Sequence, residues 1–265
     1  MSNANSVFRV DGKVAVVVGG GSGIGQAAAI ALAQSGATVV CADVNPAGAQ
    51  ATVDLIAKEG LKGSALEMDI TKRSSIDAGV NGVKAAHGKI DILVTTPAIN
   101  VRKRLLTYTD EELDRVVDLN LKGSFKVTRA VAQVMCDTAS GGSIILTSSI
   151  RSLVVEPGQG VYAATKASLV QMARGFAVEL APQGIRVNAI APGVIDTPLT
   201  APIKKNADWY SAYANRSAMK RWGSPEELAW PIVFLASGAS SFVTGAVLFV
   251  DGGWTAVDGR YEPPL

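Results

Sequence analysis

The chain has 265 residues, of which 48% are hydrophobic and 18% are charged. This composition is that of a globular protein with a large core, which excludes intrinsic disorder, and α/β folds often reach about 250 residues as a single domain. The formal net charge of +2 provides no strong field for a polyanion, and the basic cluster at 102–104 is too short to argue for nucleic acid.

Neither a membrane span nor a secretion signal is visible. No stretch approaches 18 uncharged apolar residues, and residues 1–10 are polar. Cys41 and Cys136 lie in a strand-like and a helical run and form no CxxC pair, which is typical of core packing in a reducing compartment. We therefore expect a soluble cytoplasmic protein with no membrane partner and no nucleic-acid partner.

Short apolar runs alternate with longer amphipathic runs along the chain. In chain order they predict a strand at 14–18, a helix at 24–34, a strand at 38–42, a helix at 47–58, a strand at 64–68, a helix at 74–86, a strand at 90–94, a helix at 110–135, a strand at 143–147, a helix at 163–180, a strand at 186–190, a helix at 225–236 and a strand at 246–250. The strands lack period-two alternation, as in a parallel sheet covered on both faces. This order predicts a single-domain, Rossmann-type α/β fold with a doubly wound, seven-stranded parallel sheet.

The least regular stretch is 192–223, which holds three prolines, mixed charge and the aromatic residues Trp209, Tyr210 and Tyr213. A segment of this length without one clear period is commonly a substrate loop or lid. A pair of short surface helices is the other interpretation, and the sequence leaves both open.

A glycine-rich turn follows the first strand directly and opens an alanine-rich helix. It reads Gly-Gly-Gly-Ser-Gly-Ile-Gly at 19–25. Glycine permits positive φ and lets main-chain amides approach a pyrophosphate, which the helix N-terminus also attracts. Gly25 is expected to face the sheet and allow close packing of helix and strand. Taken alone, the cluster can also be a simple strand-to-helix turn.

Acidic residues end the next two strands. Asp43 stands where a carboxylate can accept both hydroxyls of an adenosine ribose, so turn and acid together predict dinucleotide binding. The same carboxylate would repel a 2′-phosphate, and no Arg or Lys lies in the turn or directly after Asp43, so NAD is expected rather than NADP. Asp69 either accepts from the adenine amino group or caps the helix beginning near Thr71.

Tyr162 and Lys166 are four residues apart and therefore share one helix face. Such pairs are common by chance, but Ser149 follows the strand at 143–147 at the edge where open α/β sheets bind ligands. An adjacent ammonium lowers the pKa of a phenol, so Lys166 is expected to make Tyr162 an acid/base, while Ser149 holds the substrate oxygen. Lys166 could also hold the nicotinamide ribose.

In order and spacing these motifs resemble the short-chain dehydrogenase/reductase family over nearly the whole chain. Further matching motifs are Asp118-Leu119-Asn120, 192–197 and 250–253. The resemblance implies that Asn120 holds a water in the proton relay from Lys166, and that Ile195 and Thr197 meet the nicotinamide carboxamide. The expected catalytic residues are Asn120, Ser149, Tyr162 and Lys166, and the expected cofactor contacts are Gly19, Gly21, Ser22, Gly23, Ile24, Gly25, Asp43, Val44, Asp69, Ile70, Thr96, Pro97, Ala98, Tyr162, Lys166, Pro192, Gly193, Ile195 and Thr197.

The resemblance also implies a homotetramer. The helices at 110–135 and 163–180, together with the last helix and strand, would build its interfaces, although core packing explains the apolar stretch at 242–250 equally well. The tail at 254–265 is a candidate to reach a neighbouring subunit.

Two stretches depart from the family pattern. Val18 stands where members usually carry Thr, and 95–98 reads Thr-Thr-Pro-Ala in place of Asn-Asn-Ala-Gly. Pro97 removes a backbone donor, and Ala98 adds a methyl group where the family's glycine admits the cofactor closely. Thr95 could still hydrogen-bond neighbouring strands through its hydroxyl.

Three residues are candidate substrate contacts. Arg102 follows the fourth-strand loop and Arg151 follows Ser149, so both could bind a carboxylate, and Gln159 is the third candidate. Each arginine could instead be a surface ion-pair partner. The segment 99–103 is similar to that of gluconate-type sugar-acid dehydrogenases. We therefore predict an NAD(H)-dependent oxidoreductase that interconverts a secondary alcohol and a ketone on a small polar substrate, such as a sugar acid or polyol.

Two other functions remain open. A 3-oxoacyl-thioester reductase is the first, although such members usually prefer NADPH, which Asp43 opposes. A non-catalytic NAD-binding regulatory protein is the second, and only the altered stretch 95–98 favours it. The single histidine, His87, lies near a helix end, no Gly-x-Ser-x-Gly is present and no residues have zinc spacing, so neither a Ser-His-Asp hydrolase nor a metal is expected.

Overall fold

The computed structural model describes residues 6–257 and confirms the predicted doubly wound sheet. Its strands are β1 (Val14–Val18), β2 (Thr38–Asp43), β3 (Gly63–Glu67), β4 (Ile92–Thr95), β5 (Gly142–Thr147), β6 (Ile185–Pro192) and β7 (Val247–Val250). They are all parallel, in the order β3-β2-β1-β4-β5-β6-β7. The direction of winding therefore reverses between β1 and β4, which is where sheets of this kind bind ligands.

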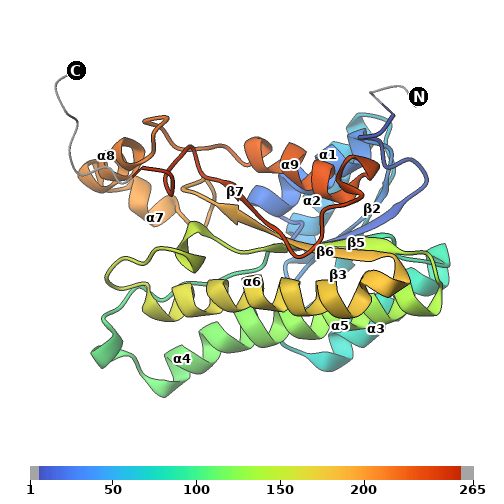
Figure 1. Cartoon of the computed structure of the whole chain (residues 1–265), viewed down its shortest axis with the longest axis horizontal. Helices are drawn as coiled ribbons and strands as arrows, with labels where there is room; N and C mark the ends of the chain where they lie inside the picture. Colours follow the sequence, from blue (N-terminus) through green and yellow to red (C-terminus); the bar gives the residue numbers. More distant parts are fainter. Residues whose placement is uncertain (1–5, 258–265) are drawn as a thin grey trace.

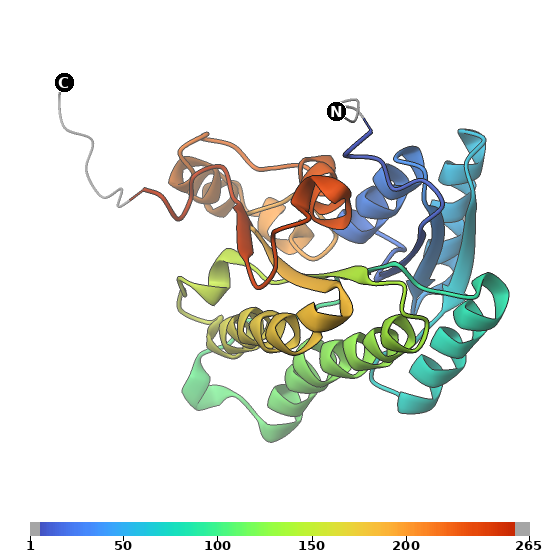
Figure 2. The ribbon, with the colours of Figure 1, turned by 45° about the vertical axis from the view of Figure 1, so that its right-hand side comes forward.

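Helices cover both faces of the sheet (Figures 1 and 2). One face carries α1 (Gly23–Gln34), α2 (Pro46–Lys58) and α9 (Glu226–Ala236), and the other carries α3 (Arg73–His87), α5 (Ser124–Asp137) and α6 (Gly160–Leu180). Successive strand residues point to opposite faces, so Val17 joins one apolar cluster and Val16 the other. Because both faces are buried, the strands are apolar throughout, as their sequence indicated.

The predicted helix at 110–135 is interrupted. It consists of α4 (Asp110–Val117), a π-helical stretch, η2 (Asp118–Gly123), and α5. Thr109 and Glu112 form a reciprocal capping box at the start of α4. A π-helical turn holds an extra residue and frequently marks a functional site. Here it contains Asn120, which is fully buried.

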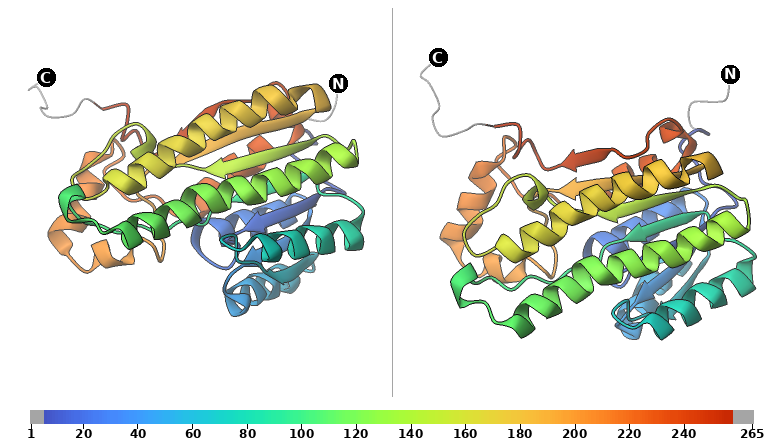
Figure 3. Two further views of the ribbon diagram at one scale, coloured as in Figure 1. Left: turned by 90° about the horizontal axis from the view of Figure 1, so that it is seen from below. Right: turned by 60° about the horizontal axis from the view of Figure 1, so that its bottom comes forward.

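The segment 192–223 contains two short helices, α7 (Ala201–Lys204) and α8 (Ala207–Arg216). Figure 3 shows them beyond the arrowheads of the strands, at the carboxyl edge of the sheet. Ile203, Tyr213 and Trp222 from this segment pack with Ile150 and Trp254 into a small apolar cluster. The segment is therefore helical and also covers the edge where ligands bind.

The remaining expectations concern cysteines, metals and membranes. Cys41 is buried, Cys136 is half-buried, and both are free thiols. His87 ends α3 before Gly88, which has a φ of 75°. Within residues 6–257 no group of His, Cys, Asp and Glu could hold a metal ion, and no helix there combines the length and apolarity that crossing a bilayer requires. The tail expected to reach a neighbour lies in part, at 258–265, outside the described residues.

Candidate active site

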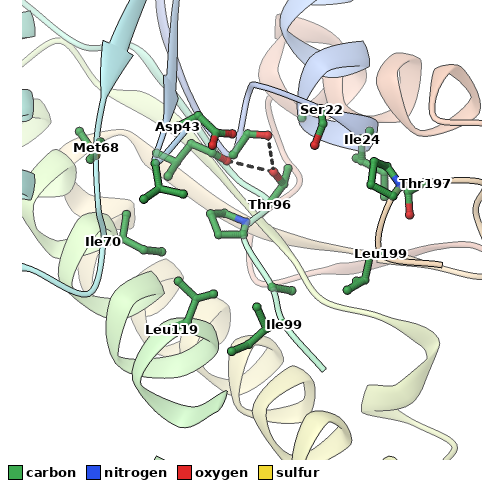
Figure 4. A pocket seen from close by; sticks show the side chains of 18 of the residues that line it. Ser22, Ile24, Asp43, Met68, Ile70, Thr96, Ile99, Leu119, Thr197 and Leu199 are labelled. Atoms are coloured by element: carbon green, nitrogen blue, oxygen red, sulfur yellow. Dashed lines mark hydrogen bonds between the residues drawn. The ribbon is translucent and has the colours of Figure 1, made fainter. Parts of the chain in front are cut away.

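A cavity of about 520 Å³ opens at the carboxyl ends of β1 and β4. Figure 4 shows Met68, Ile70 and Leu119 on one side of it and Ile24, Thr197 and Leu199 on the other. Its size is typical of a small-molecule or cofactor site. Of the expected cofactor contacts, it is lined by Gly19, Ser22, Gly23, Ile24, Gly25, Asp43, Val44, Asp69, Ile70, Thr96, Pro97, Ala98 and Thr197.

The glycine turn forms one wall of this cavity. Gly19 and Gly23 have positive φ values of 79° and 52°, and a Cβ atom on Gly25 would lie 2.0 Å from the Gly19 carbonyl oxygen. Ser22 precedes α1 without making a side-chain cap, and the first turn of the helix holds no acidic residue. The first-turn amides therefore lack the usual side-chain acceptor and suit an anion such as a pyrophosphate.

Asp43 is fixed against this turn. Its Oδ2 accepts a hydrogen bond from the Gly21 amide at 2.9 Å, and its Oδ1 accepts one from the Asn45 amide at 2.9 Å. Both oxygens are thus oriented by main-chain donors, and the carboxylate lines the cavity at the end of β2.

Asp69 also lines the cavity but is held by its own neighbours. Its carboxylate accepts from the amide of Thr71 at 2.9 Å and from the Thr71 hydroxyl, and it pairs with Lys72 at 3.2 Å. The hydrogen bond from the Thr71 hydroxyl is the main reason that the pKa of Asp69 is lowered. Because α3 begins at Arg73, after Lys72, Asp69 forms a local turn and does not cap the helix, which corrects one of the two predicted roles.

The departure at 95–98 has a structural answer that the sequence did not predict. The hydroxyl of Thr95 is buried without a hydrogen-bond partner, so the expectation that it bonds the neighbouring strands was wrong. Thr96, one residue beyond β4, points to the turn instead, and its Oγ1 donates to the carbonyls of Val18 at 3.0 Å and Gly19 at 3.2 Å (Figure 4). Thr96 therefore joins the ends of β1 and β4.

The residues present fit a nicotinamide dinucleotide. The glycine turn would hold the pyrophosphate, and the oriented carboxylate of Asp43 would accept from the adenosine ribose. When bound, this cofactor supplies a hydride donor or acceptor.

A second, smaller cavity of about 70 Å³ adjoins the first, and Leu199 lines both. It brings together Ser149, Tyr162 and all three predicted substrate contacts. The lining residues that the sequence did not single out come mostly from the loops after β4 and β6 and from α7 and α8. The full lining is Asn100, Arg102, Ser149, Ile150, Arg151, Gln159, Tyr162, Gly193, Val194, Leu199, Thr200, Ile203 and Tyr213.

The electrostatics of Tyr162 differ from the prediction. Burial raises the pKa of this phenol, and the effects that lower it come from a hydrogen bond with Ser149 and from the charges of Arg102 and Arg151. The Lys166 Nζ lies 5.6 Å from the centre of the Tyr162 ring and donates to the Thr147 carbonyl at 2.8 Å. Burial also lowers the pKa of Lys166 to about 7. Lys166 is thus only partly charged near neutrality, which weakens the effect expected of a permanent ammonium.

Asn120 connects the two sides of the site. Its amide accepts from the Ile99 amide at 2.9 Å and donates to the Ile99 carbonyl at 2.9 Å and to the Thr165 hydroxyl at 3.1 Å. Thr165 in turn donates to the Tyr162 carbonyl at 2.8 Å. The π-helical stretch therefore fixes the loop after β4 against the start of α6, between the two cavities.

Glu156 is the most important residue that sequence reasoning missed. Its carboxylate pairs with Arg102 at 2.9 Å and with Arg151 at 2.8 Å, and it also accepts hydrogen bonds from Gln159 and Tyr213. Both arginines, which line the smaller cavity, therefore have an ion-pair partner directly behind it, in a neighbouring cavity that Arg151 and Tyr213 also line. The available signal was that Glu156 is the sole acidic residue between Asp137 and Glu179.

Six expected cofactor contacts do not line the larger cavity. Tyr162 lines the smaller cavity, and Lys166 is bonded to the Thr147 carbonyl. The Ile195 side chain packs in the apolar core, so a contact of this residue with the nicotinamide carboxamide would have to use its backbone. Pro192 ends β6, the Gly21 amide is bonded to Asp43, and Gly193 lines the smaller cavity.

The fold and the two adjoining cavities define a nucleotide-dependent oxidoreductase. The chain belongs to the short-chain dehydrogenase/reductase family, because residues 18–255 match a family model described as enoyl-(acyl carrier protein) reductase and curated relatives align over nearly its full length.

Three relatives illustrate the similarity. The chain is 40% identical to a 3-oxoacyl-[acyl-carrier-protein] reductase, FabG, of Thermotoga maritima, over 93% of this chain and 99% of the relative. It is 36% identical to a 2-dehydro-3-deoxy-D-gluconate 5-dehydrogenase of Pseudoalteromonas atlantica, over 93% and 97%. A crystal structure of a gluconate 5-dehydrogenase from Burkholderia cenocepacia, in complex with NADP and tartrate, superposes with a TM-score of 0.92 and 34% identity, over 96% of this chain and 100% of the other.

Proposed function

We propose that this protein is an NAD(H)-dependent dehydrogenase that interconverts a secondary alcohol and a ketone on a small hydroxylated acid or polyol. One observation carries the proposal: Ser149 and Tyr162 share a cavity of about 70 Å³ with Arg102, Arg151 and Gln159, and this cavity adjoins the larger one. Acid/base groups and candidate anion-binding groups thus face the same small space.

In the oxidative direction, Ser149 holds the substrate hydroxyl and Tyr162 takes its proton. A nicotinamide bound in the larger cavity would supply the hydride acceptor. The positive charges of Arg102 and Arg151 stabilise the phenolate form of Tyr162 and therefore oppose the rise in its pKa that burial causes. Lys166, with a pKa of about 7, can hold or release a proton near neutrality. Asn120 supports this relay by fixing the loop after β4 against the start of α6, through its bonds to Ile99 and Thr165. Reduction of the ketone runs through the same groups in reverse.

The larger cavity favours NAD over NADP. Among the residues that line it are the carboxylates of Asp43 and Asp69, and none is lysine or arginine. A 2′-phosphate placed beside the oriented Asp43 carboxylate would meet repulsion with no lining cation to offset it. The Burkholderia cenocepacia structure is a complex with NADP, so it does not support NAD. The proposal of NAD rests on the residues of this chain alone.

The charge of the smaller cavity favours a monocarboxylate. Two guanidinium groups and one carboxylate, from Arg102, Arg151 and Glu156, leave one excess positive charge. Relatives named for gluconate derivatives act on acids of this kind. A 3-oxoacyl-thioester reductase is the second candidate, because the Thermotoga maritima relative bears that name.

We also propose a cytoplasmic homotetramer. The two free cysteines fit a reducing compartment. Large apolar side chains are exposed on the helices expected at the interfaces, including Leu113, Phe125 and Val178, and Phe242 is fully exposed just before the edge strand β7. Apolar side chains and an open sheet edge of this kind are commonly covered by another subunit.

The test is turnover of a panel of alcohols and ketones with NAD(H) and NADP(H), followed by nicotinamide absorbance. Tyr162→Phe should lower kcat by about 100-fold to 10,000-fold, because it removes the group that transfers the proton. Because Tyr162 is also an expected cofactor contact, binding of NADH should weaken far less than kcat falls. Tyr210→Phe, which removes a phenol stacked on Trp222 outside the smaller cavity, is the matched control. Cofactor binding without turnover that depends on Tyr162 would support a regulatory protein instead.

A further inference from the structure

Glu156 holds a position that the proposed reaction does not explain. It lies in the loop between η3 (Ile150–Ser152) and α6, and its carboxylate contacts four donors from three separate segments of the chain. Two of these donors are the guanidinium groups of Arg102 and Arg151, at 2.9 and 2.8 Å. The other two are the Gln159 amide and the Tyr213 hydroxyl. Four donors to one half-buried carboxylate form a built site and not a surface ion pair.

The two arginines do not depend on Glu156 alone for their positions. The Arg102 guanidinium lies over the Trp209 ring, 5.1 Å from its centre, and the Arg151 guanidinium lies 5.6 Å from the centre of the Trp254 ring. Such cation–π contacts hold a guanidinium in place through its flat face. Loss of the Glu156 charge would therefore leave both cations facing the smaller cavity.

Each guanidinium also keeps hydrogen-bonding capacity for a ligand. Arg102 uses Nη1 and Arg151 uses Nη2 to reach Glu156, and an arginine has five N–H donors in all. Within residues 6–257, Glu156 is the one carboxylate paired with either arginine. The cluster therefore holds a single excess positive charge and free donors around it, as a substrate with one carboxylate requires.

We infer that Glu156 is a specificity-determining residue, which sets the excess charge of the substrate cavity at one and thereby selects a monocarboxylate over both a neutral polyol and a dicarboxylate. This inference deepens the proposed function and rests on its substrate class. Glu156 neither touches the reacting atoms nor transfers a proton; it acts through the two arginines.

The experiment uses three ligands with the same six-carbon skeleton and increasing charge: D-sorbitol, D-gluconate and D-glucarate. Their affinities for the NADH-loaded enzyme are measured by calorimetry, and kcat/KM with NAD is measured in parallel. The wild-type protein should bind D-gluconate most tightly. In Glu156→Gln, which keeps the shape but not the charge, the affinity for D-glucarate relative to D-gluconate should rise about tenfold, because a second cation is no longer neutralised.

Two control variants separate charge from packing. Glu156→Asp keeps the charge on a shorter side chain, and Tyr213→Phe removes one hydrogen bond to Glu156 without altering charge. Both variants can weaken all three ligands, but the ratio of D-glucarate to D-gluconate affinity should stay at the wild-type value. If Tyr213→Phe changes that ratio as Glu156→Gln does, the effect comes from packing and the inference fails.

The remaining outcomes separate the inference from the proposed function. A ratio in Glu156→Gln within twofold of wild type overturns the inference, whatever the turnover. If the predicted binding series is obtained but none of the three ligands is converted, the proposed substrate fails and the role of Glu156 in charge selection stands. If wild type binds none of the three, both fail.

Discussion

The two adjoining cavities are built by different means. The larger one is formed mainly by backbone: a glycine turn, helix amides without a side-chain cap and a carboxylate oriented by two main-chain donors. The smaller one is formed mainly by side chains, and the cluster of Arg102, Arg151 and Glu156 lies against the rings of the 192–223 segment. Backbone sites tolerate few substitutions, whereas side-chain sites can change specificity one residue at a time.

The largest expected effect tests the backbone side of this comparison. A Cβ at position 25 would lie 2.0 Å from the Gly19 carbonyl oxygen, so backbone must move. Gly25→Ala should weaken NADH binding on the order of 100-fold, measured by calorimetry. Gly82→Ala is the matched control, because Gly82 lies in α3 with open space around it, and it should leave binding unchanged while raising stability by about 1 kcal/mol. Equal binding by wild type and Gly25→Ala would contradict a rigid turn.

The second prediction concerns buried charge on the side-chain side. The pKa of Lys166 is about 7 in the folded protein and 10.5 ordinarily, so between these values the unfolded chain binds the extra proton. Folding stability from this group therefore rises with pH between about 7 and 10.5, and it stays constant at its lowest value below about 7, where both states bind the proton. Between about pH 7 and pH 9 the wild type should gain on the order of 2 kcal/mol more than Lys166→Met in urea unfolding. Parallel curves for both proteins would show that Lys166 titrates normally.

A third variant tests how the backbone-held carboxylate selects the cofactor. Asp43→Asn keeps the side-chain shape and removes the charge that faces a 2′-phosphate. The ratio of kcat/KM with NADP to that with NAD should rise about tenfold. Asp69→Asn removes a charge from the same cavity, but there the carboxylate is already paired with Lys72, so the ratio should change little. Similar shifts in both variants would mean that general charge, and not the position of Asp43, sets the preference.

The smallest effect should come from the two adjacent threonines after Val94. Thr96→Val removes hydrogen bonds to two carbonyl oxygens and should lower the unfolding free energy by about 1 kcal/mol. Thr95→Val removes a buried hydroxyl that has no partner and should be neutral or stabilising. Thermal or urea unfolding of both variants distinguishes the two sites, and an equal loss in both would contradict the assigned bonds.

The difference between a cavity built by backbone and one built by side chains also explains which features could be predicted from the sequence. The glycine turn, Asp43 and the strand order depend on residues close in the chain and on general rules for parallel sheets, so they were predictable. Glu156 was not, because its role depends on Arg102 and Tyr213, which come from distant segments. We expected a hydroxyl near the end of β4 to bond the neighbouring strand, but we assigned this role to Thr95 instead of Thr96. Successive side chains of a strand point to opposite faces, so an error of one residue reverses the direction of the hydroxyl.

The direction of two pKa shifts was also hidden from the sequence. The spacing of Tyr162 and Lys166 predicted that the two side chains lie together, and Lys166 Nζ does lie 5.6 Å from the centre of the Tyr162 ring, but spacing does not reveal burial. The structure encloses both side chains, which raises the pKa of the phenol and lowers that of the amine. The π-helical interruption of the helix at 110–135 was equally hidden, because an amphipathic pattern continues through one inserted residue.

The rings that cover the arginine cluster provide an optical signal. The chain has four tryptophans, and three of them, Trp209, Trp222 and Trp254, contact Tyr210, Tyr213 or the arginines around the smaller cavity. The fourth, Trp230, is exposed on α9. Intrinsic fluorescence of the unlabelled protein is therefore dominated by this edge of the molecule, and replacing Trp230 alone would leave an emission spectrum that comes from the rings around the arginine cluster.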